Sequence, residues 1–200
     1  LTTDRDTYGI YVQSPFPKEN RRILIGSDVS SRYTRRNRAE YRKIAGYIAR
    51  CVWQRQGNYM VFFPSYRLME DVLQVYEEEF SVDWVRCVCQ TPDMTEQERE
   101  GFLEEFQERE GTLVGFCVLG GIFSEGVDLT GESLIGAVIV GTGLPQIGSQ
   151  REILKEYYDK KNHCGFDYAY RYPGMNKVLQ AAGRVIRTKE DKGVILLLDD

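Results

Sequence analysis

The segment from Gln180 to Arg187, with the sequence QAAGRVIR, carries the residues best suited to binding a phosphorylated ligand. In a helix, Gln180, Arg184 and Arg187 share one face, because side chains four and seven positions apart lie above one another. Gly183 lies beside them and would allow a ligand to approach closely. A guanidinium offers a fixed fork of donors that fits phosphate oxygens. The pattern therefore predicts a polyphosphate-binding face, although arginines at a helix C-terminus also interact favourably with the helix dipole alone.

A polar turn is expected after residue 119, where a buried apolar stretch ends. From residue 120 its sequence is GGIFSEGVDL, which supplies glycines, the Ser124 hydroxyl and the carboxylates of Glu125 and Asp128. Such a turn could meet a phosphate backbone on one side and a nucleotide on the other. A tight loop without a ligand explains the same residues almost as well.

The third candidate is the FFPSY segment at residues 62–66, where an apolar strand leads into a helix. Ser65 is placed to cap that helix, and Tyr66 follows it. Free N–H groups at a helix N-terminus attract phosphate. A plain capping role for Ser65 is the competing interpretation.

Several well-known arrangements are absent from the sequence. It contains no G-x-x-x-x-G-K-[ST] phosphate loop, and no G-x-G-x-x-G follows a predicted strand, so a triphosphate has no backbone cradle of the usual kind. Because His163 is its one histidine and its closest cysteines are Cys87 and Cys89, the chain is expected to hold no metal. Five scattered cysteines, mostly inside apolar stretches, indicate reduced thiols and a cytoplasmic protein.

These segments must be positioned by alternating strands and helices. Strands are expected at residues 22–25, 59–63, 85–89, 112–119, 134–140 and 193–198, and helices at 37–56, 66–80, 150–160 and 174–186 and behind a capping box at 95–98. Apolar strands that alternate with helices indicate an open α/β fold whose parallel sheet is covered on both faces. Ligands bind at the carboxyl ends of such strands, where we expect the loops that start at Pro64, Gly120, Gly141 and Thr188.

Composition adds limits on size and partners. The 200 residues are 42% hydrophobic and 28% charged, which suits one sizeable core. No stretch provides the roughly 20 continuous apolar residues that cross a bilayer, so no membrane partner is expected. The net charge of -4 hides a split, because residues 1–60 carry 12 basic and 5 acidic side chains and residues 70–110 carry 14 acidic ones. The acidic part is typical of a solvated helical face, whereas the basic residues 32–43 suit either phosphate contact or an exposed helix start.

In this order, the three candidate segments resemble the second motor domain of superfamily 2 helicases of the XPD/DinG-like group. Residues 62–66 resemble motif IV of that group, residues 121–128 resemble motif V, and residues 180–187 resemble motif VI with its Q-x-x-G-R-x-x-R pattern. The resemblance spans essentially the whole chain. It implies a RecA-like parallel sheet without a phosphate loop of its own, with residues 1–22 leading in from a first motor domain and residues 23–200 forming the second.

The resemblance also implies a role for each candidate residue. Arg184 and Arg187, with Gln180 beside them, would reach ATP across a cleft between two motor domains and stabilise charge on the transferred phosphate. The other implied nucleotide contacts are Gly126, Asp128 and Gly183, and the implied contacts to single-stranded DNA are Ser65, Tyr66, Ser124 and Glu125. ATP and Mg²⁺ would be bound mainly by the first motor domain. The 200-residue chain alone is therefore expected neither to hydrolyse ATP nor to unwind DNA, and the resemblance alone implies 5′ to 3′ movement for the intact enzyme.

Two other functions fit the residues. One is a non-catalytic RecA-like module that binds a protein partner through the acidic residues 70–110. The other is an α/β transferase that binds a sugar nucleotide at the strand ends. That second reading needs a donor-binding carboxylate and a catalytic base, for which the sequence offers no convincing pair.

Overall fold

The computed structural model describes residue 12 and residues 14–107, 110–123 and 133–200. This part is built on a six-stranded sheet in the order β1-β6-β5-β2-β4-β3, and every paired strand runs parallel to its neighbour. The strands are β1 (Arg21–Gly26), β2 (Asn58–Phe63), β3 (Val85–Cys89), β4 (Thr112–Val118), β5 (Gly136–Val140) and β6 (Gly193–Leu198). The expected open parallel sheet is thereby confirmed. No helix among the described residues is long and apolar enough to cross a membrane.

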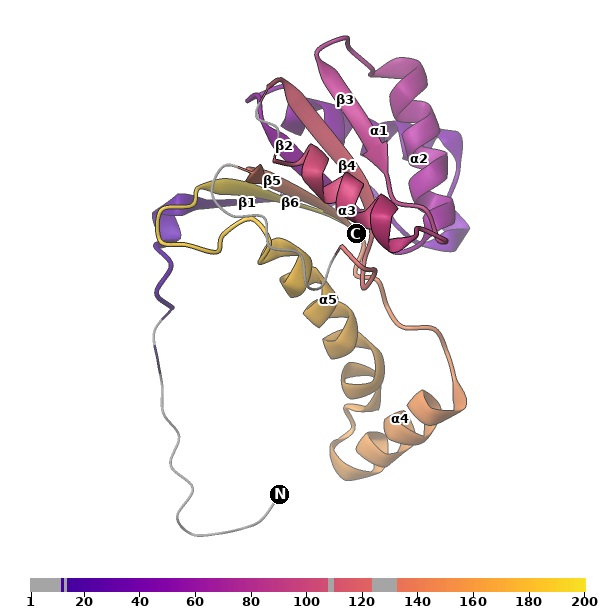
Figure 1. Ribbon diagram of the computed structural model, residues 1–200. Helices are drawn as coiled ribbons and strands as arrows, with labels where there is room; N and C mark the ends of the chain where they lie inside the picture. The colour runs from indigo at the N-terminus through magenta and orange to yellow at the C-terminus, as the bar shows by residue number, and fades with distance from the viewer. Residues whose placement is uncertain (1–11, 13, 108–109, 124–132) are drawn as a thin grey trace.

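Helices cover both faces of the sheet (Figure 1). The helices α1 (Arg38–Val52) and α2 (Tyr66–Glu79) pack on one face, and α3 (Glu96–Glu105) and α5 (Tyr172–Ala182) pack on the other. Successive side chains of the central strand β2 alternate between the two cores, with Val61 and Phe63 on the side of α1 and Phe62 on the side of α3. All residues of β2 and β4 are buried, which explains why these strands are apolar nearly throughout.

The helix α4 (Ser149–Asn162) departs from this layered core. Figure 1 shows α4 and the start of α5 extending away from the sheet, and no residue of α4 is buried. A π-helical turn, η4 (Asp167–Arg171), joins α4 to α5. The extension is held together by polar contacts, since Arg151 donates to the carbonyl of Ala169 at 3.0 Å and the Tyr170 hydroxyl donates to Glu152.

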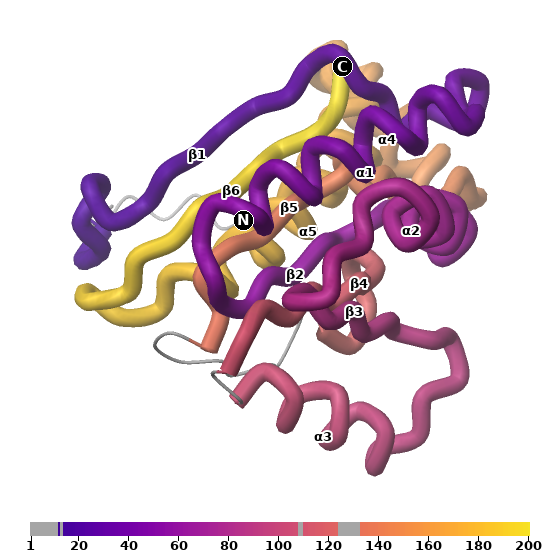
Figure 2. The backbone as a smooth tube through the Cα atoms, turned by 90° about the horizontal axis from the view of Figure 1, so that it is seen from above, coloured from indigo at the N-terminus to yellow at the C-terminus, as the bar shows by residue number. Residues whose placement is uncertain are grey.

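The edge strand β1 is the most exposed part of the sheet (Figure 2). It pairs with β6 alone, and its side chains Ile23 and Ile25 are 52% and 72% exposed. Short 3-10 turns flank this strand, η1 (Lys18–Asn20) before it and η2 (Tyr33–Arg35) after it.

Two expected helices end earlier in the structure than the sequence pattern suggested. The helix α1 ends at Val52 and not at residue 56, because residues 53–56 are exposed and provide no further apolar face. The helix α5 ends at Ala182, four residues before the expected end at Ile186. The second difference changes how the arginines of the QAAGRVIR segment are presented.

Candidate functional site

The arginines of the QAAGRVIR segment lie in a turn beyond α5. Gly183 caps the helix, and the backbone N–H of Arg184 donates to the carbonyl of Ala181 at 3.2 Å. The predicted single helical face through Gln180, Arg184 and Arg187 is therefore wrong, because only Gln180 lies within the helix. Both arginines are half-buried, whereas Gln180 and Gly183 are exposed.

Two features end the helix α5 at this point, the low helix propensity of Gly183 and the packing of Val185. Glycine is a poor helix former, so Gly183 weakens any continuation. Val185 is only 2% exposed and packs against Gly193, the first residue of β6. A turn lets Val185 enter the core while the chain direction changes toward β6.

Asp191 fixes the backbone around Arg187. Its Oδ2 accepts from the backbone N–H of Arg187 at 2.8 Å and from that of Thr188 at 2.7 Å, while Oδ1 accepts from the Thr188 hydroxyl at 2.8 Å. Burial alone would raise the pKa of Asp191, but these hydrogen bonds outweigh it and hold the pKa of the carboxyl below its usual value. The turn that carries Arg187 is thus held by an ionised carboxylate.

This turn lies at the amino ends of the strands. Gly193, where β6 begins, lies against both Val185 and the backbone of Ile135, the residue directly before β5. The Thr188 loop precedes β6, so the expectation that it lies at a strand carboxyl end is wrong. In a parallel sheet, a helix that follows one strand must return to the amino end of the next, and α5 delivers its C-terminal turn there.

The motif IV-like segment lies at the opposite ends of the strands, directly after the carboxyl end of β2. Ser65 is the N-cap of α2, and its side chain accepts from the backbone N–H of Leu68 at 3.4 Å. The hydroxyl of Tyr66 accepts from Gln90 Nε2 at 2.9 Å. Burial, opposed by this hydrogen bond, raises the pKa of Tyr66. Ser65 and Tyr66 therefore place two hydroxyl groups at the carboxyl end of β2.

Gln90, which the sequence did not single out, connects the motif IV-like and motif V-like segments. It is 3% exposed, follows β3, and its Oε1 accepts from the backbone N–H of Val118 at 3.1 Å. Its Nε2 also lies against Gly121, so one amide contacts Tyr66 and the glycine turn after β4. A polar residue directly after an apolar strand was the available signal.

The rest of the motif V-like turn lies largely outside the described residues. Gly120 has a φ of 71°, a left-handed conformation that favours glycine, and it begins the turn after β4. The candidate residues Ser124, Glu125, Gly126 and Asp128 fall in the part of the chain that the structure leaves undescribed.

A cluster of exposed tyrosines on α4, η4 and α5 was also not predicted. The rings of Tyr158 and Tyr168 stack with centroids 4.0 Å apart and an angle of 7° between their planes. Tyr157 packs edge-on against Tyr158, and Tyr172 packs edge-on against Tyr168. Tyr157 and Tyr172 are 56% and 50% exposed, and the Lys161 ammonium lies 5.7 Å from the Tyr157 ring centre. Repeated tyrosines within an otherwise polar stretch were the sequence signal for this tyrosine cluster.

Comparison with known proteins identifies the family. A family model described as a helicase C-terminal domain matches residues 48–200. The chain belongs to this family. A probable ATP-dependent helicase of Methanocaldococcus jannaschii is 28% identical over 95% of this chain and 30% of its own length. The ATP-dependent DNA helicase XPD of Sulfolobus acidocaldarius is 29% identical over 88% of this chain and 30% of its own length.

A solved XPD helicase structure has the same fold. It superposes with a TM-score of 0.71 at 26% identity and covers 90% of this chain and 31% of its own. The RecA-like fold and the resemblance to the second motor domain of the XPD/DinG-like group are thereby confirmed. The helicase C-terminal domain described here spans about 30% of the length of the curated relatives it matches.

Proposed function

We propose that this chain is the part of an ATP-dependent DNA helicase that completes the ATP site of a first motor domain and holds single-stranded DNA. The observation that carries the proposal is the turn at the end of α5, where Asp191 braces the backbone that carries Arg187 and Arg184 precedes it. Guanidiniums held on a braced turn can stabilise the charge that develops on a transferred phosphate without reorganising.

The separation of the candidate residues supports a division of tasks. The arginine turn lies at the amino ends of β5 and β6, whereas Ser65 and Tyr66 lie at the carboxyl end of β2. We assign ATP hydrolysis to Arg184 and Arg187, with Gln180 and Gly183 beside them, and single-strand contact to the edge of Ser65 and Tyr66. We also assign contact with the nucleotide to Gly126 and Asp128. Contact with single-stranded DNA is assigned to Ser124 and Glu125.

The exposed tyrosine cluster supports a nucleic-acid ligand. Unpaired bases stack on aromatic side chains irrespective of sequence, and a neighbouring cation adds attraction to the phosphate backbone. Tyr157 and Tyr172 each present half of their surface to solvent, and Lys161 lies beside the first of them.

The alternative of a protein-interaction module is less well supported. Its proposed surface, residues 70–110, is partly neutralised by arginines from elsewhere in the chain. Arg38 pairs with both Glu78 and Glu79, and Arg42 pairs with Glu79. Carboxylates that already have partners offer less charge to another protein, and Glu78 and Glu79 are of this kind.

The arginine assignment is tested by replacing Arg184 with alanine in the full-length protein. Arg184→Ala should lower DNA-stimulated ATP turnover by roughly 10³-fold or more, because an arginine finger contributes about that much to phosphoryl transfer. Binding of a fluorescent oligodeoxythymidine should change little, since this residue lies away from the edge of Ser65. Arg171→Ala, which removes an exposed arginine of η4, is the charge-matched control. Unchanged turnover in the Arg184→Ala protein would remove the assignment.

A further inference from the structure

The basic loop after β1, residues 30–36, lies at the carboxyl edge of the sheet. The side chain of Ser31 packs against Gly141, which follows β5, and Pro64 lies against the same glycine. Asp199 and Asp200 follow β6 and contact the loop directly. Sequence alone left the place of these basic residues open, and the structure puts them on the same edge as Ser65.

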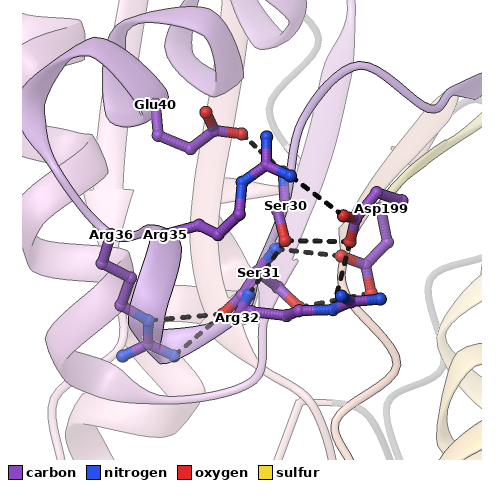
Figure 3. A network of polar contacts seen from close by, with 8 residues as sticks. Ser30, Ser31, Arg32, Arg35, Arg36, Glu40 and Asp199 are labelled. Carbon is purple, nitrogen blue, oxygen red and sulfur yellow. Dashed lines mark hydrogen bonds and ion pairs between the residues drawn. The ribbon is translucent and has the colours of Figure 1, made fainter.

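Three acidic side chains hold the serines and backbone of this loop (Figure 3). The backbone N–H of Ser30 donates to Glu40, whose residue is 6% exposed. The Ser30 hydroxyl donates to Asp200 at 2.9 Å, and the backbone N–H of Ser31 donates to Asp199 at 2.9 Å. These contacts hold the loop through its serines and backbone, and the guanidiniums of Arg32 and Arg35 take no part in them.

Few carboxylates lie near the exposed arginines of the loop. Arg32 and Arg35 both contact Asp200 at 3.4 Å, and their side chains are 66% and 52% exposed. Two guanidiniums thus share one carboxylate, through long contacts that contribute little in water. Arg36 forms no ion pair with any described residue; it donates twice to the carbonyl of Ser31 at 3.3 Å.

A fourth arginine joins them from α2. Arg67 is exposed and follows the N-cap of α2, at the carboxyl end of β2. Arg67 comes two residues after Ser65, in the first turn of α2. The loop and the start of α2 therefore both lie at the carboxyl ends of the strands.

We propose that Arg32, Arg35 and Arg36, together with Arg67, bind the phosphates of a nucleic-acid single strand. This arginine surface extends the strand's path from Ser65 and Tyr66 across the ends of β5 and β6 to the loop after β1. It rests on the proposed single-strand contact at the same edge. Each phosphate that an arginine neutralises releases condensed counterions. On binding, Arg32 and Arg35 exchange their contacts with Asp200 for contacts with the phosphates.

The test measures the salt dependence of oligodeoxythymidine binding by the full-length protein. The variant Arg32→Gln/Arg35→Gln should bind more weakly at low salt, and the slope of log K against log salt concentration should become shallower by about 1.4, since each single-strand phosphate contact contributes about 0.7. The control is Arg22→Gln/Arg50→Gln, which removes two exposed arginines that lie beside the groove between α1 and β1. The control should leave the slope unchanged.

A second variant distinguishes phosphate binding from a structural role. Asp200→Asn keeps an acceptor for Ser30 but removes the carboxylate that competes for Arg32 and Arg35, so it should tighten oligodeoxythymidine binding. A purely structural role predicts no gain. An unchanged slope in the arginine variant, with normal binding by the wild type, overturns this inference alone. Failure of the wild type to bind the oligonucleotide overturns the proposed single-strand contact and this inference with it.

Discussion

At the residue scale, a single buried carboxylate determines how the arginine turn is built. Asp191 is 7% exposed and accepts hydrogen bonds from two backbone N–H groups and one hydroxyl of residues 187 and 188. Those groups lie beyond the end of α5, past the hydrogen bonds of the helix itself. The carboxylate supplies the acceptors for these groups, and the backbone at Arg187 is thereby held in place.

Replacing Asp191 with asparagine should destabilise the chain and change its response to acid. We expect Asp191→Asn to lower the free energy of unfolding by about 1.5 kcal/mol at pH 7, since the amide lacks the charge and has one acceptor oxygen where the carboxylate has two. The pKa of Asp191 is lowered in the folded state, so its contribution is fully present above the unfolded value of about 3.9 and is lost as the pH falls through the folded value. The difference between wild type and variant should therefore shrink below pH 4 in urea titrations.

The neighbouring Glu190 provides the control for this prediction. Glu190 is exposed, and Glu190→Gln removes the same formal charge without touching the turn. It should behave as the wild type at every pH. A constant difference between Asp191→Asn and wild type from pH 7 to pH 2 would contradict a stabilising carboxylate at this position.

At the element scale, local signals fixed where helices begin far better than where they end. Asn37, Ser65 and Thr95 each accept a backbone hydrogen bond at the start of a helix, as their residue types predict. Helix ends depended on packing instead, since α5 stops where Val185 enters the core. Capping is a local interaction, whereas termination here requires knowing which strand lies nearby.

The capping box of α3 offers a stability test at this scale. The Thr95 hydroxyl accepts from the backbone N–H of Glu98 at 3.3 Å, and Glu98 accepts in return from the backbone N–H of Thr95 at 2.7 Å. Thr95→Ala should lower the free energy of unfolding by about 1 kcal/mol and the melting temperature by about 2–4 °C. Thr95→Ser keeps the hydroxyl and should stay near the wild type. Equal losses in both variants would show that the methyl group of Thr95, and not the cap, is responsible.

At the scale of the whole molecule, the parallel sheet separates the proposed tasks onto two edges. The arginine turn lies at the amino ends of β5 and β6, and the Ser65 segment and the arginine surface lie at the carboxyl ends of β1 and β2. In a parallel sheet, loops that lead from a strand to a helix lie at the carboxyl ends, and loops that lead from a helix to the next strand lie at the amino ends, so this separation follows from the topology. One domain can thereby contact a nucleotide and a strand at the same time.

The purified 200-residue chain should not turn over ATP, with or without oligodeoxythymidine. Its sequence contains no phosphate loop, and its proposed arginines act only on a nucleotide that another domain holds. Adding the first motor domain of the same protein as a separate polypeptide should restore some turnover, which Arg184→Ala should abolish. Phosphate release by the 200-residue chain alone would contradict this view of the domain.

The sequence by itself determined the elements and the family. Continuous apolar stretches, period-3.6 apolar patterns, capping residues and the ordered motifs are all local, so they predicted the six strands, the helix starts and the helicase resemblance. Only the tertiary structure decided that Arg187 is held by Asp191, that Gln90 joins Tyr66 to the glycine turn, and that the basic loop after β1 lies beside Gly141. These contacts join residues on different strands or beyond a helix end, and their formation depends on how the sheet is ordered and where each helix stops.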